Sequence, residues 1–343
     1  MADGVAGTVG AMIGGMEYTN LGRTGLSVSR ICLGTMNFGP TVSEEDSHGV
    51  LDHALAEGVN FVDTANVYGR QRGEGITEKV LGSWFAQGDG RRETTVLATK
   101  VYGPMGDGPN DRGLSARHIV TACEESLRRM RTDYIDLYQM HHVERSTPWE
   151  EIWQAMDLLV SQGKIRYVGS SNFAGWHIAA CNEEARRRHS LGLVSEQCIY
   201  NLMNRYVELE VLPAAEHYGV GILPWSPLNG GALSGVLRKL ADGTAERSAH
   251  SRAAEAVEHD RVQLERWEAL CEELGHPPTE VALAWLLSQP VVTAPIVGPR
   301  TIAHVDGAIN AIRLTLEPET LAALDALFPP VGKSGPGPEA WAW

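Results

Sequence analysis

Short apolar runs alternate with longer amphipathic segments along most of the chain. The short runs are rich in Val, Ile and Leu, as is typical of buried strands. They cover residues 30–33, 60–63, 94–99, 134–139, 165–169, 194–197, 220–224 and 294–297. The longer segments, 43–58, 114–130, 147–163 and 208–219, show helical patterns. The first of them begins with Ser43, which suits a helix N-terminus, and ends at Gly58, which suits a C-terminal stop.

Eight strand–helix units in sequence favour a single (β/α)8 barrel over a doubly wound sheet. We therefore expect one α/β domain over residues 16–330, a flexible leader over 1–15 and a tail over 331–343, with Met16 as an alternative start. The tail is rich in Pro and Gly but ends in two tryptophans, so we expect it to pack over the barrel mouth; disorder is the alternative. The long gap 230–258 is predicted to be a functional loop.

The composition narrows the class of protein. With 43% hydrophobic and 21% charged residues, the chain is typical of a globular domain with a sizeable core. Its formal net charge of -14 argues against general binding to nucleic acids or to anionic membranes, because like charges repel. A small anion held in a local basic pocket is compatible with this charge.

The cysteines indicate a reducing compartment. Cys32, Cys123, Cys181, Cys198 and Cys271 lie far apart, without a CxxC pair or another ligand-like cluster. Reduced thiols in a cytoplasmic protein are the simplest interpretation. The N-terminal stretch is glycine-rich, short and without a basic leading region, so we expect neither a signal peptide nor a transmembrane segment.

Polar side chains follow the predicted strands at the point where each strand ends. In a barrel these ends meet at one mouth, so residues that are distant in sequence converge there. In chain order the strand ends carry Asp63, Lys100, His141, Ser171 with Asn172, Gln197, Trp225 and Arg300. Packing does not explain so many polar residues at consecutive strand ends. The sequence therefore predicts a reaction centre at the mouth.

Tyr68 lies five residues after Asp63. A tyrosine near a lysine and a histidine makes chemical sense as a proton donor to a carbonyl oxygen. Tyrosine has an ordinary pKa of about 10, too high for efficient donation at neutral pH. A nearby ammonium such as Lys100 lowers this pKa, and a carboxylate holds the ammonium in place. Taken singly, Asp63 could be a turn cap, Tyr68 a packed aromatic and Lys100 a solvated cation. His141 beside His142 could belong to a metal site, but no further ligand has a supporting spacing, so we predict no metal.

Several sequence blocks carry a family resemblance. They are YTNLGRTGLSVSRICLGTMNFG, DTANVYG, ATK, DLYQMHH, GKIRYVGSSNF, WSPLNGG and IVGPRT. In these blocks and their order the chain resembles the aldo-keto reductases from about Glu17 to Leu327. The resemblance implies a (β/α)8 barrel that binds NADPH in an extended pose across its mouth. It also implies a catalytic tetrad of Asp63, Tyr68, Lys100 and His141.

The same resemblance implies a role for each tetrad residue. Tyr68 is the general acid, Lys100 lowers its pKa, and Asp63 orients Lys100. His141 hydrogen-bonds the carbonyl oxygen of the substrate. Hydride passes from the nicotinamide to the carbonyl carbon while Tyr68 protonates the oxygen.

The resemblance also implies which residues hold the cofactor. Ser171, Asn172 and Gln197 correspond to the groups that hold the carboxamide, and Trp225 to the aromatic residue that stacks on the nicotinamide. Arg300 corresponds to the residue that binds the 2′-phosphate, which favours NADPH over NADH. The complete predicted set is Gly34, Thr35, Met36, Asp63, Ser171, Asn172, Gln197, Trp225, Ser226, Leu228, Gly230, Arg252, Gly298, Arg300 and His304.

The phosphate and adenine contacts depart from the family pattern. The segment 226–230 matches the one that cradles the pyrophosphate, partly through backbone N–H groups. Residues 307–308 are Gly and Ala where the family often has an acid and an asparagine, and His304 is a partial substitute. Val236 stands where a lysine often occurs, and Arg252 is a candidate contact to the phosphates.

These observations predict an NADPH-dependent reductase of aldehydes and ketones. Some blocks look closest to bacterial reductases of deoxysugar pathways, so an NDP-4-keto-6-deoxyhexose 2,3-reductase is the alternative substrate class. Potassium-channel β-subunits share the fold and many blocks, which leaves a cofactor-bound regulatory subunit as a third interpretation. We expect a small carbonyl substrate, no nucleic-acid or membrane partner and a cytoplasmic location. Homo-oligomerisation stays open.

Overall fold

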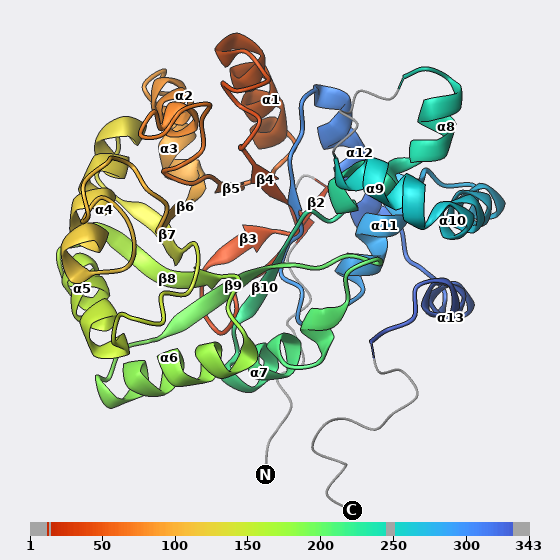
Figure 1. Cartoon of the computed structure of the whole chain (residues 1–343). Coiled ribbons are helices and arrows are strands. Elements are labelled where there is room, and N and C mark those ends of the chain that lie inside the picture. Colours follow the sequence, from red (N-terminus) through yellow and green to blue (C-terminus); the bar gives the residue numbers. More distant parts are fainter. Residues whose placement is uncertain (1–11, 14, 245–250, 332–343) are drawn as a thin grey trace, which may run out of the picture.

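Eight parallel strands form the centre of the fold, and helices form an outer ring around them (Figure 1). The computed structural model describes residues 12–13, 15–244 and 251–331. The strands are β4 (Cys32–Gly34), β5 (Phe61–Asp63), β6 (Val96–Val101), β7 (Ile135–Met140), β8 (Ile165–Ser171), β9 (Leu193–Ile199), β10 (Gly221–Trp225) and β11 (Ile296–Val297). They pair in the order β10-β9-β8-β7-β6-β5-β4-β11. The predicted single (β/α)8 barrel is confirmed.

The two ends of this sheet meet, which closes the barrel. Ile222 on β10 pairs in parallel with Val292, just before β11. The N–H of Ile222 donates to the carbonyl of Val291 at 3.0 Å, and its carbonyl accepts from the N–H of Thr293 at 2.9 Å. In a closed parallel barrel, all the C-terminal strand ends lie on one rim. The candidate site residues at these ends therefore face a common mouth.

Side-chain caps and glycines mark the ends of several helices. The helices are α1 (Glu44–Ala56), α2 (Ile76–Phe85), α3 (Arg91–Thr94), α4 (Ala116–Met130), α5 (Trp149–Ser161), α6 (Gly175–Arg187), α7 (Val211–Tyr218), α8 (Val236–Ala241), α9 (Arg252–His259), α10 (Arg261–Leu274), α11 (Pro278–Leu287), α12 (Ile302–Arg313) and α13 (Pro318–Leu327), with the 3₁₀ helices η1 (Tyr206–Glu208) and η2 (Asn229–Ser234). Ser43 and Ser115 cap α1 and α4, each accepting a backbone N–H on its side-chain oxygen. After α7, Gly219 takes a φ of 64°, which side-chain-bearing residues rarely adopt.

An antiparallel hairpin covers the end of the barrel opposite the mouth. It consists of β2 (Met16–Asn20) and β3 (Ser27–Ser29), and β1 (Met12–Ile13) pairs with β2. Leu21 and Val28 are completely buried in a cluster with Phe61 and Val194, which lie at the starts of their strands. The hairpin was not predicted, because its strands are short and polar residues dominate them.

Parts of the chain differ from the sequence prediction. The strand predicted over 94–99 begins at Val96, because Thr94 ends α3 and its N–H donates to the carbonyl of Gly90. The gap 230–258, predicted as a loop, is largely helical in its described parts and contains η2, α8 and α9. Residues 245–250, the predicted tail from 332 onward, and 1–11 and 14 of the predicted leader lie outside the described residues.

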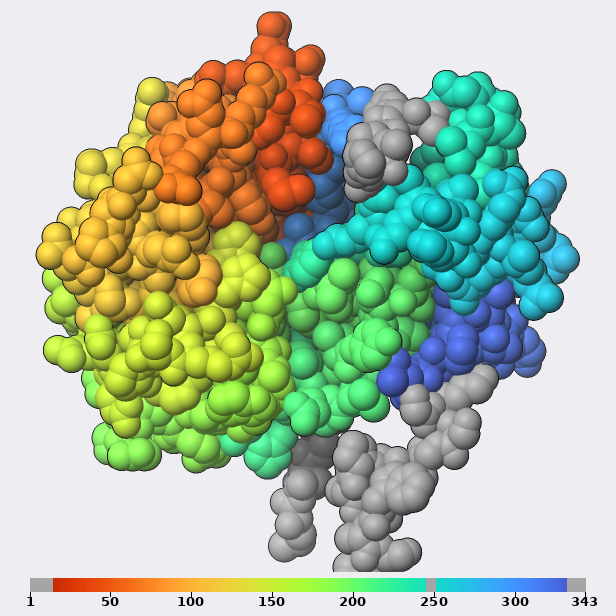
Figure 2. Space-filling model, in the orientation of Figure 1, coloured from red at the N-terminus to blue at the C-terminus, as the bar shows by residue number. Residues whose placement is uncertain are grey.

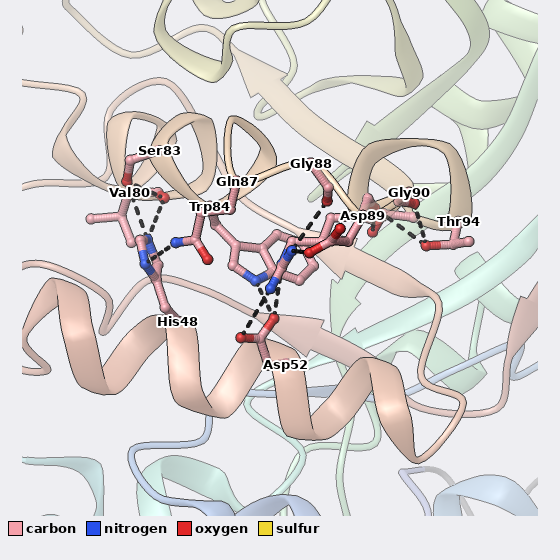
Figure 3. Close-up of polar contacts among 12 residues, drawn as sticks. His48, Asp52, Val80, Ser83, Trp84, Gln87, Gly88, Asp89, Gly90 and Thr94 are labelled. Carbon is pink, nitrogen blue, oxygen red and sulfur yellow. Dashed lines mark hydrogen bonds and ion pairs between the residues drawn. The ribbon is translucent and has the colours of Figure 1, made fainter.

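A polar network ties α1 to α2 and α3 on the outside of the barrel (Figure 3). Asp52 on α1 accepts from Trp84 Nε1 at 2.7 Å and from Arg91 Nε at 3.0 Å. His48, also on α1, lies with Nδ1 2.8 Å from Gln87 Nε2. These contacts hold together the two helices that precede and follow β5 in the chain and the short helix that precedes β6.

Gly82 lies at a close contact between α2 and α4. A Cβ atom at this position would lie 2.1 Å from the carbonyl oxygen of Arg129 and 3.0 Å from backbone atoms of Met130. We expect Gly82→Ala to lower the free energy of unfolding by about 1–3 kcal/mol, because backbone atoms cannot move aside easily. Urea unfolding followed by circular dichroism measures this change.

Gly49→Ala on α1 is the matched control. No neighbouring atom lies within 4 Å of its Cβ position. Alanine there should leave the free energy of unfolding unchanged or raise it by up to about 1 kcal/mol, since glycine weakens a helix. Equal losses from the two substitutions would contradict the close approach of α2 and α4.

Candidate active site

A buried ion pair lies at the C-terminal ends of two neighbouring strands. Lys100 on β6 donates from Nζ to Asp63 Oδ2 on β5 at 2.5 Å. The same Nζ donates to the carbonyl of Thr64 at 2.9 Å and to the hydroxyl of Tyr68 at 3.1 Å. Lys100 is fully buried, and Asp63 is 2% exposed. The acid, the cation and the phenol that the sequence predicts as one group are therefore in direct contact.

Two glutamine side chains hold the other oxygen of Asp63. Gln139 on β7 and Gln197 on β9 donate from Nε2 to Asp63 Oδ1 at 3.0 and 2.9 Å. Gln197 Nε2 also donates to Gln139 Oε1 at 3.3 Å. Gln139 was not predicted, although its register opposite Lys100 places it at the same level of the barrel. The carboxylate is thus bonded at both oxygens, which fixes its orientation toward Lys100.

Burial and charge act in opposite directions on the site. Burial raises the pKa of Tyr68 above its ordinary value. The charge of Lys100 lowers this pKa but does not outweigh burial, so the net shift is upward. Burial alone would lower the pKa of Lys100, but Asp63 and Tyr68 raise it above its ordinary value. At neutral pH the site therefore holds an ammonium beside a protonated phenol.

His141 is a neutral imidazole next to Tyr68. The two rings lie edge to face with centroids 6.0 Å apart, and His142 stacks on His141 at 5.3 Å. Burial, the charge of Lys100 and His142 lower the pKa of His141 to about 2. A neutral imidazole offers one N–H donor and one acceptor at pH 7. Among the residues described, no group of three or more His, Cys, Asp and Glu side chains is arranged to hold a metal ion.

The side chain of Asn172 joins the ends of β7, β8 and β10. Its Nδ2 donates to the carbonyl of His141 at 3.1 Å and to Ser171 Oγ at 3.0 Å. Its Oδ1 accepts from Trp225 Nε1 at 3.0 Å. Ser171 Oγ in turn donates to the carbonyl of Gln197 at 2.9 Å. These residues, predicted separately from their strand ends, form one connected group.

Comparison of the chain with known proteins identifies its relatives. Residues 30–328 match the model of the Aldo/keto reductase family. The chain is 52% identical to the uncharacterized oxidoreductase YrpG of Bacillus subtilis, over 96% of this chain and 100% of the relative. It is 33% identical to versiconal hemiacetal acetate reductase of Aspergillus parasiticus, over 92% of this chain and 98% of the relative. A probable voltage-gated potassium channel subunit beta of Arabidopsis thaliana is 32% identical, over 87% and 91%.

The chain belongs to the aldo/keto reductase family. The family membership predicted from the sequence blocks is thereby confirmed, and the chain is an oxidoreductase of a family that uses nicotinamide cofactors. Within its described residues, this aldo/keto reductase has no helix that is both long and apolar enough to span a membrane.

In this reductase the segment after β10 turns tightly. Ser226, Asn229 and Gly230 have φ values of 54°, 46° and 67°. Ser226 Oγ accepts from the N–H of Gly230 at 3.0 Å, and the Ser226 carbonyl accepts from the N–H of Asn229 at 2.9 Å. These N–H groups bond within the turn. Helix α9 adds a cation: Arg252 Nη1 lies 3.3 Å from Ser226 Oγ, and its guanidinium lies 4.9 Å from the centroid of the Trp225 ring.

The predicted cofactor residues around β4 and β11 lie side by side, since these strands pair. A Cβ atom on Gly34 would lie 2.7 Å from a side-chain atom of β11, so only glycine fits this contact without a shift. Thr35 is fully buried, and its hydroxyl donates to the carbonyl of Asp63 at 2.9 Å, so it supports the strand end. Met36 is 60% exposed. Gly298 follows β11 directly.

Arg300 lies just before α12, and His304 lies in its first turn. The backbone N–H of Arg300 donates to His304 Nδ1 at 3.2 Å, so the imidazole helps to hold the turn that carries Arg300. Of the residues that depart from the family pattern, Ala308 is buried and Gly307 has open space at its Cβ position. Leu228 is partly buried just before η2. In the space-filling view the surface is hollowed near its centre, where orange, yellow-green, green and cyan segments meet (Figure 2).

Lys100→Met leaves the buried Asp63 carboxylate without its cation. We expect the free energy of unfolding to fall by about 3–5 kcal/mol, because an uncompensated buried charge is costly. The double variant Lys100→Met with Asp63→Asn should recover part of this loss, since it removes the remaining charge. Urea unfolding at pH 7 of the wild type, both single variants and the double variant gives the coupling free energy.

Lys164→Met is the matched control. Lys164 forms an ion pair with Glu124 at 2.6 Å, but these side chains are 29% and 47% exposed. Exposed pairs contribute about 0–1 kcal/mol. A loss for Lys164→Met as large as that for Lys100→Met would show that burial does not set the strength of the Lys100 pair.

Proposed function

We propose that this protein is an NADPH-dependent reductase of aldehydes and ketones with Tyr68 as the general acid. The observation that carries the proposal is the 3.1 Å contact of the Tyr68 hydroxyl with Lys100 Nζ, which is itself paired with Asp63 at 2.5 Å. A phenol beside a buried ammonium can give its proton to a carbonyl oxygen, because the ammonium stabilises the phenolate that remains.

Each neighbour of Tyr68 has a distinct part in this step. The raised pKa of Tyr68 keeps its proton in place until a substrate oxygen develops negative charge. His141, neutral and edge to face with Tyr68, can donate an N–H to the same oxygen and so help to orient it. Asp63 holds the ammonium under the phenol. When bound, a nicotinamide cofactor supplies the hydride.

The residues at the mouth fit a dinucleotide with an aromatic amide at one end and phosphates along it. The side-chain nitrogen of Gln197 donates to Asp63 and to Gln139. No described group donates to its Oε1. This oxygen can therefore accept a hydrogen bond from a carboxamide. Trp225 offers aromatic surface. Arg252 and Arg300 offer guanidinium groups, which suit phosphate oxygens. In a chain of net charge -14, such local cations are needed to hold an anionic cofactor.

The relatives favour an enzyme over a regulatory subunit. The chain shares 52% identity with a protein named an oxidoreductase and 32% with one named a channel subunit. The contact between Tyr68 and Lys100 also supports catalysis. For the substrate class, the kcat/KM of a nucleotide-linked 4-keto-6-deoxy sugar relative to that of a simple aldehyde separates a deoxysugar reductase from a general carbonyl reductase.

Tyr68→Phe removes the proposed proton donor and keeps the ring. We expect kcat for NADPH oxidation with 4-nitrobenzaldehyde to fall by about 100- to 10,000-fold, the range of general acid catalysis. The Kd of NADPH, measured by fluorescence titration, should stay within about twofold, because the hydroxyl acts on proton transfer. Tyr218→Phe, which removes a hydroxyl on the outer helix α7 bonded to Glu183, serves as the control. Full turnover in Tyr68→Phe would eliminate the assigned role.

Arg300→Met tests the preference for NADPH. If Arg300 binds the 2′-phosphate, the Kd of NADPH should rise by about tenfold or more, a loss of at least about 1.4 kcal/mol. The Kd of NADH should change little, since NADH lacks that phosphate. Arg261→Met on α10, where the exposed Arg261 pairs with Glu265, controls for loss of a surface charge. Equal weakening of both cofactors would contradict recognition of the 2′-phosphate.

A further inference from the structure

Glu196 on β9 is a completely buried acidic residue near the mouth of the barrel. It lies on β9 next to Gln197, and side chains alternate along a strand, so the two point to opposite sides of β9. No ion pair among the described residues includes Glu196. Buried carboxyl groups without a cation are rare, because burial penalises their charge. The proton-transfer chemistry proposed above leaves Glu196 without a role.

The hydrogen bonds of Glu196 bracket a pair of proposed cofactor residues. One carboxyl oxygen accepts from the N–H of Phe173 at 2.9 Å, and the other bonds to Ser170 Oγ. Ser170 Oγ also reaches the carbonyl of Ser195 at 3.4 Å. Ser170 and Phe173 lie immediately before and after residues 171–172. Glu196 therefore bonds to the Ser170 side chain within β8 and to the backbone N–H of Phe173 beyond its end.

Residues 171–172 contain an uncommon backbone conformation. Asn172 has a φ of 60°, in the left-handed region, which costs free energy in most residues with a side chain and less in asparagine. Glu196 fixes the N–H group that follows directly. The ring of Phe173 is 3% exposed and packs against Trp149 and His177, with centroids 5.8 Å away in each case. The backbone and the side chain of Phe173 are thus both anchored.

The charge state of Glu196 agrees with a structural hydrogen-bonding role. Burial raises the pKa of Glu196 to about 8, although its hydrogen bonds lower it. The titratable groups that face it are the thiols of Cys181 on α6 and Cys198 on β9, and burial raises the pKa of each. At pH 7 the group is mainly a neutral acid, which an amide of the same shape can imitate.

We propose that Glu196 is a positioning residue for the nicotinamide end of the cofactor site. Its hydrogen bonds to the Ser170 hydroxyl and to the Phe173 N–H hold residues on both sides of Ser171 and Asn172, so that these two meet His141, Gln197 and Trp225 in one group. The inference rests on the proposed function, which assigns Ser171 and Asn172 to the carboxamide. The competing interpretation is that Glu196 only packs between β8, β9 and α6.

Two substitutions of Glu196 separate these interpretations. Glu196→Met fills the volume but accepts no hydrogen bond, whereas Glu196→Gln keeps the acceptor for Phe173 and a bond to Ser170. We expect Glu196→Met to raise the Kd of NADPH by about tenfold, which corresponds to about 1.4 kcal/mol. Glu196→Gln should stay within about twofold of the wild type. Glu196→Ala, which also lacks an acceptor, replaces Glu196→Met if the latter does not fold.

Glu78→Gln is the matched control for loss of a buried carboxyl group. Glu78 is also completely buried, but it bonds to Thr99 and Arg129 on the side of the barrel where α2 meets α4. Glu78→Gln should lower the Tm and leave the Kd of NADPH unchanged. An unchanged Kd in Glu196→Met, or an equal rise in Glu78→Gln, would overturn the positioning role.

Hydrogen–deuterium exchange gives a measurement that needs no cofactor. The N–H of Phe173 should exchange slowly in the wild type and in Glu196→Gln, and faster in Glu196→Met. If the wild type does not bind NADPH, the proposed function fails, while this exchange comparison still tests the hold of Glu196 on the backbone. If NADPH binds and Glu196→Met changes neither exchange nor Kd, the positioning role fails and the proposed function stands.

The pH dependence of stability provides a second signature of Glu196. Its pKa is raised from 4.5 to about 8 in the folded protein, so the unfolded chain loses the proton first as pH rises. The stability that the protonated group contributes is complete below pH 4.5 and is lost as pH rises toward about 8. The Tm of the wild type relative to Glu196→Gln should therefore fall over this range. A constant difference would contradict the buried neutral acid.

Discussion

The buried ion pair of Lys100 and Asp63 is the interaction on which the rest of the site depends. Two charges removed from water are tolerated only when their hydrogen-bonding capacity is used. The ammonium bonds to the carboxylate, to a carbonyl and to Tyr68, and the carboxylate adds the amides of Gln139 and Gln197. The phenol is therefore part of the solvation shell of a buried cation. The Tyr68 hydroxyl is therefore placed by its hydrogen bond to Lys100 as much as by any contact with a substrate.

The barrel makes this shell possible, because it delivers side chains from four strands to one level. Asp63 and Lys100 come from adjacent strands, and Gln139 stands opposite Lys100 in the register of β6 and β7. Gln197 reaches the same carboxylate from β9. Behind this inner layer, Glu196 bonds the backbone of the turn after β8. On β9, Gln197 thus bonds in the interior, and the residue before it, Glu196, supports the rim from outside.

The sequence predicts the parts of this arrangement that carry a strong local signal. Apolar runs gave the eight barrel strands, and a charged or polar residue at the end of a run gave Asp63 and Lys100. Gln139 was missed although it ends the predicted run 134–139, because the sequence prediction assigned His141 as the residue that this strand delivers to the mouth. Glu196 was missed because its importance lies in partners that only the folded backbone brings near. The direction in which the pKa of Tyr68 shifts could not be predicted from the sequence either, because burial in the folded protein determines it.

The hairpin at the bottom of the barrel has a consequence for how the chain folds. Leu21 and Val28 share their hydrophobic cluster with Leu223 and Ala294, which lie far later in the sequence. Contacts at such sequence separation form only after a large loop-closure entropy has been overcome. The hairpin can pack in its final position only after the last strands have formed. Until then the side chains of Leu21 and Val28 stay exposed to solvent in the nascent chain. The hairpin and the last strands of the barrel therefore come together in one late step of folding.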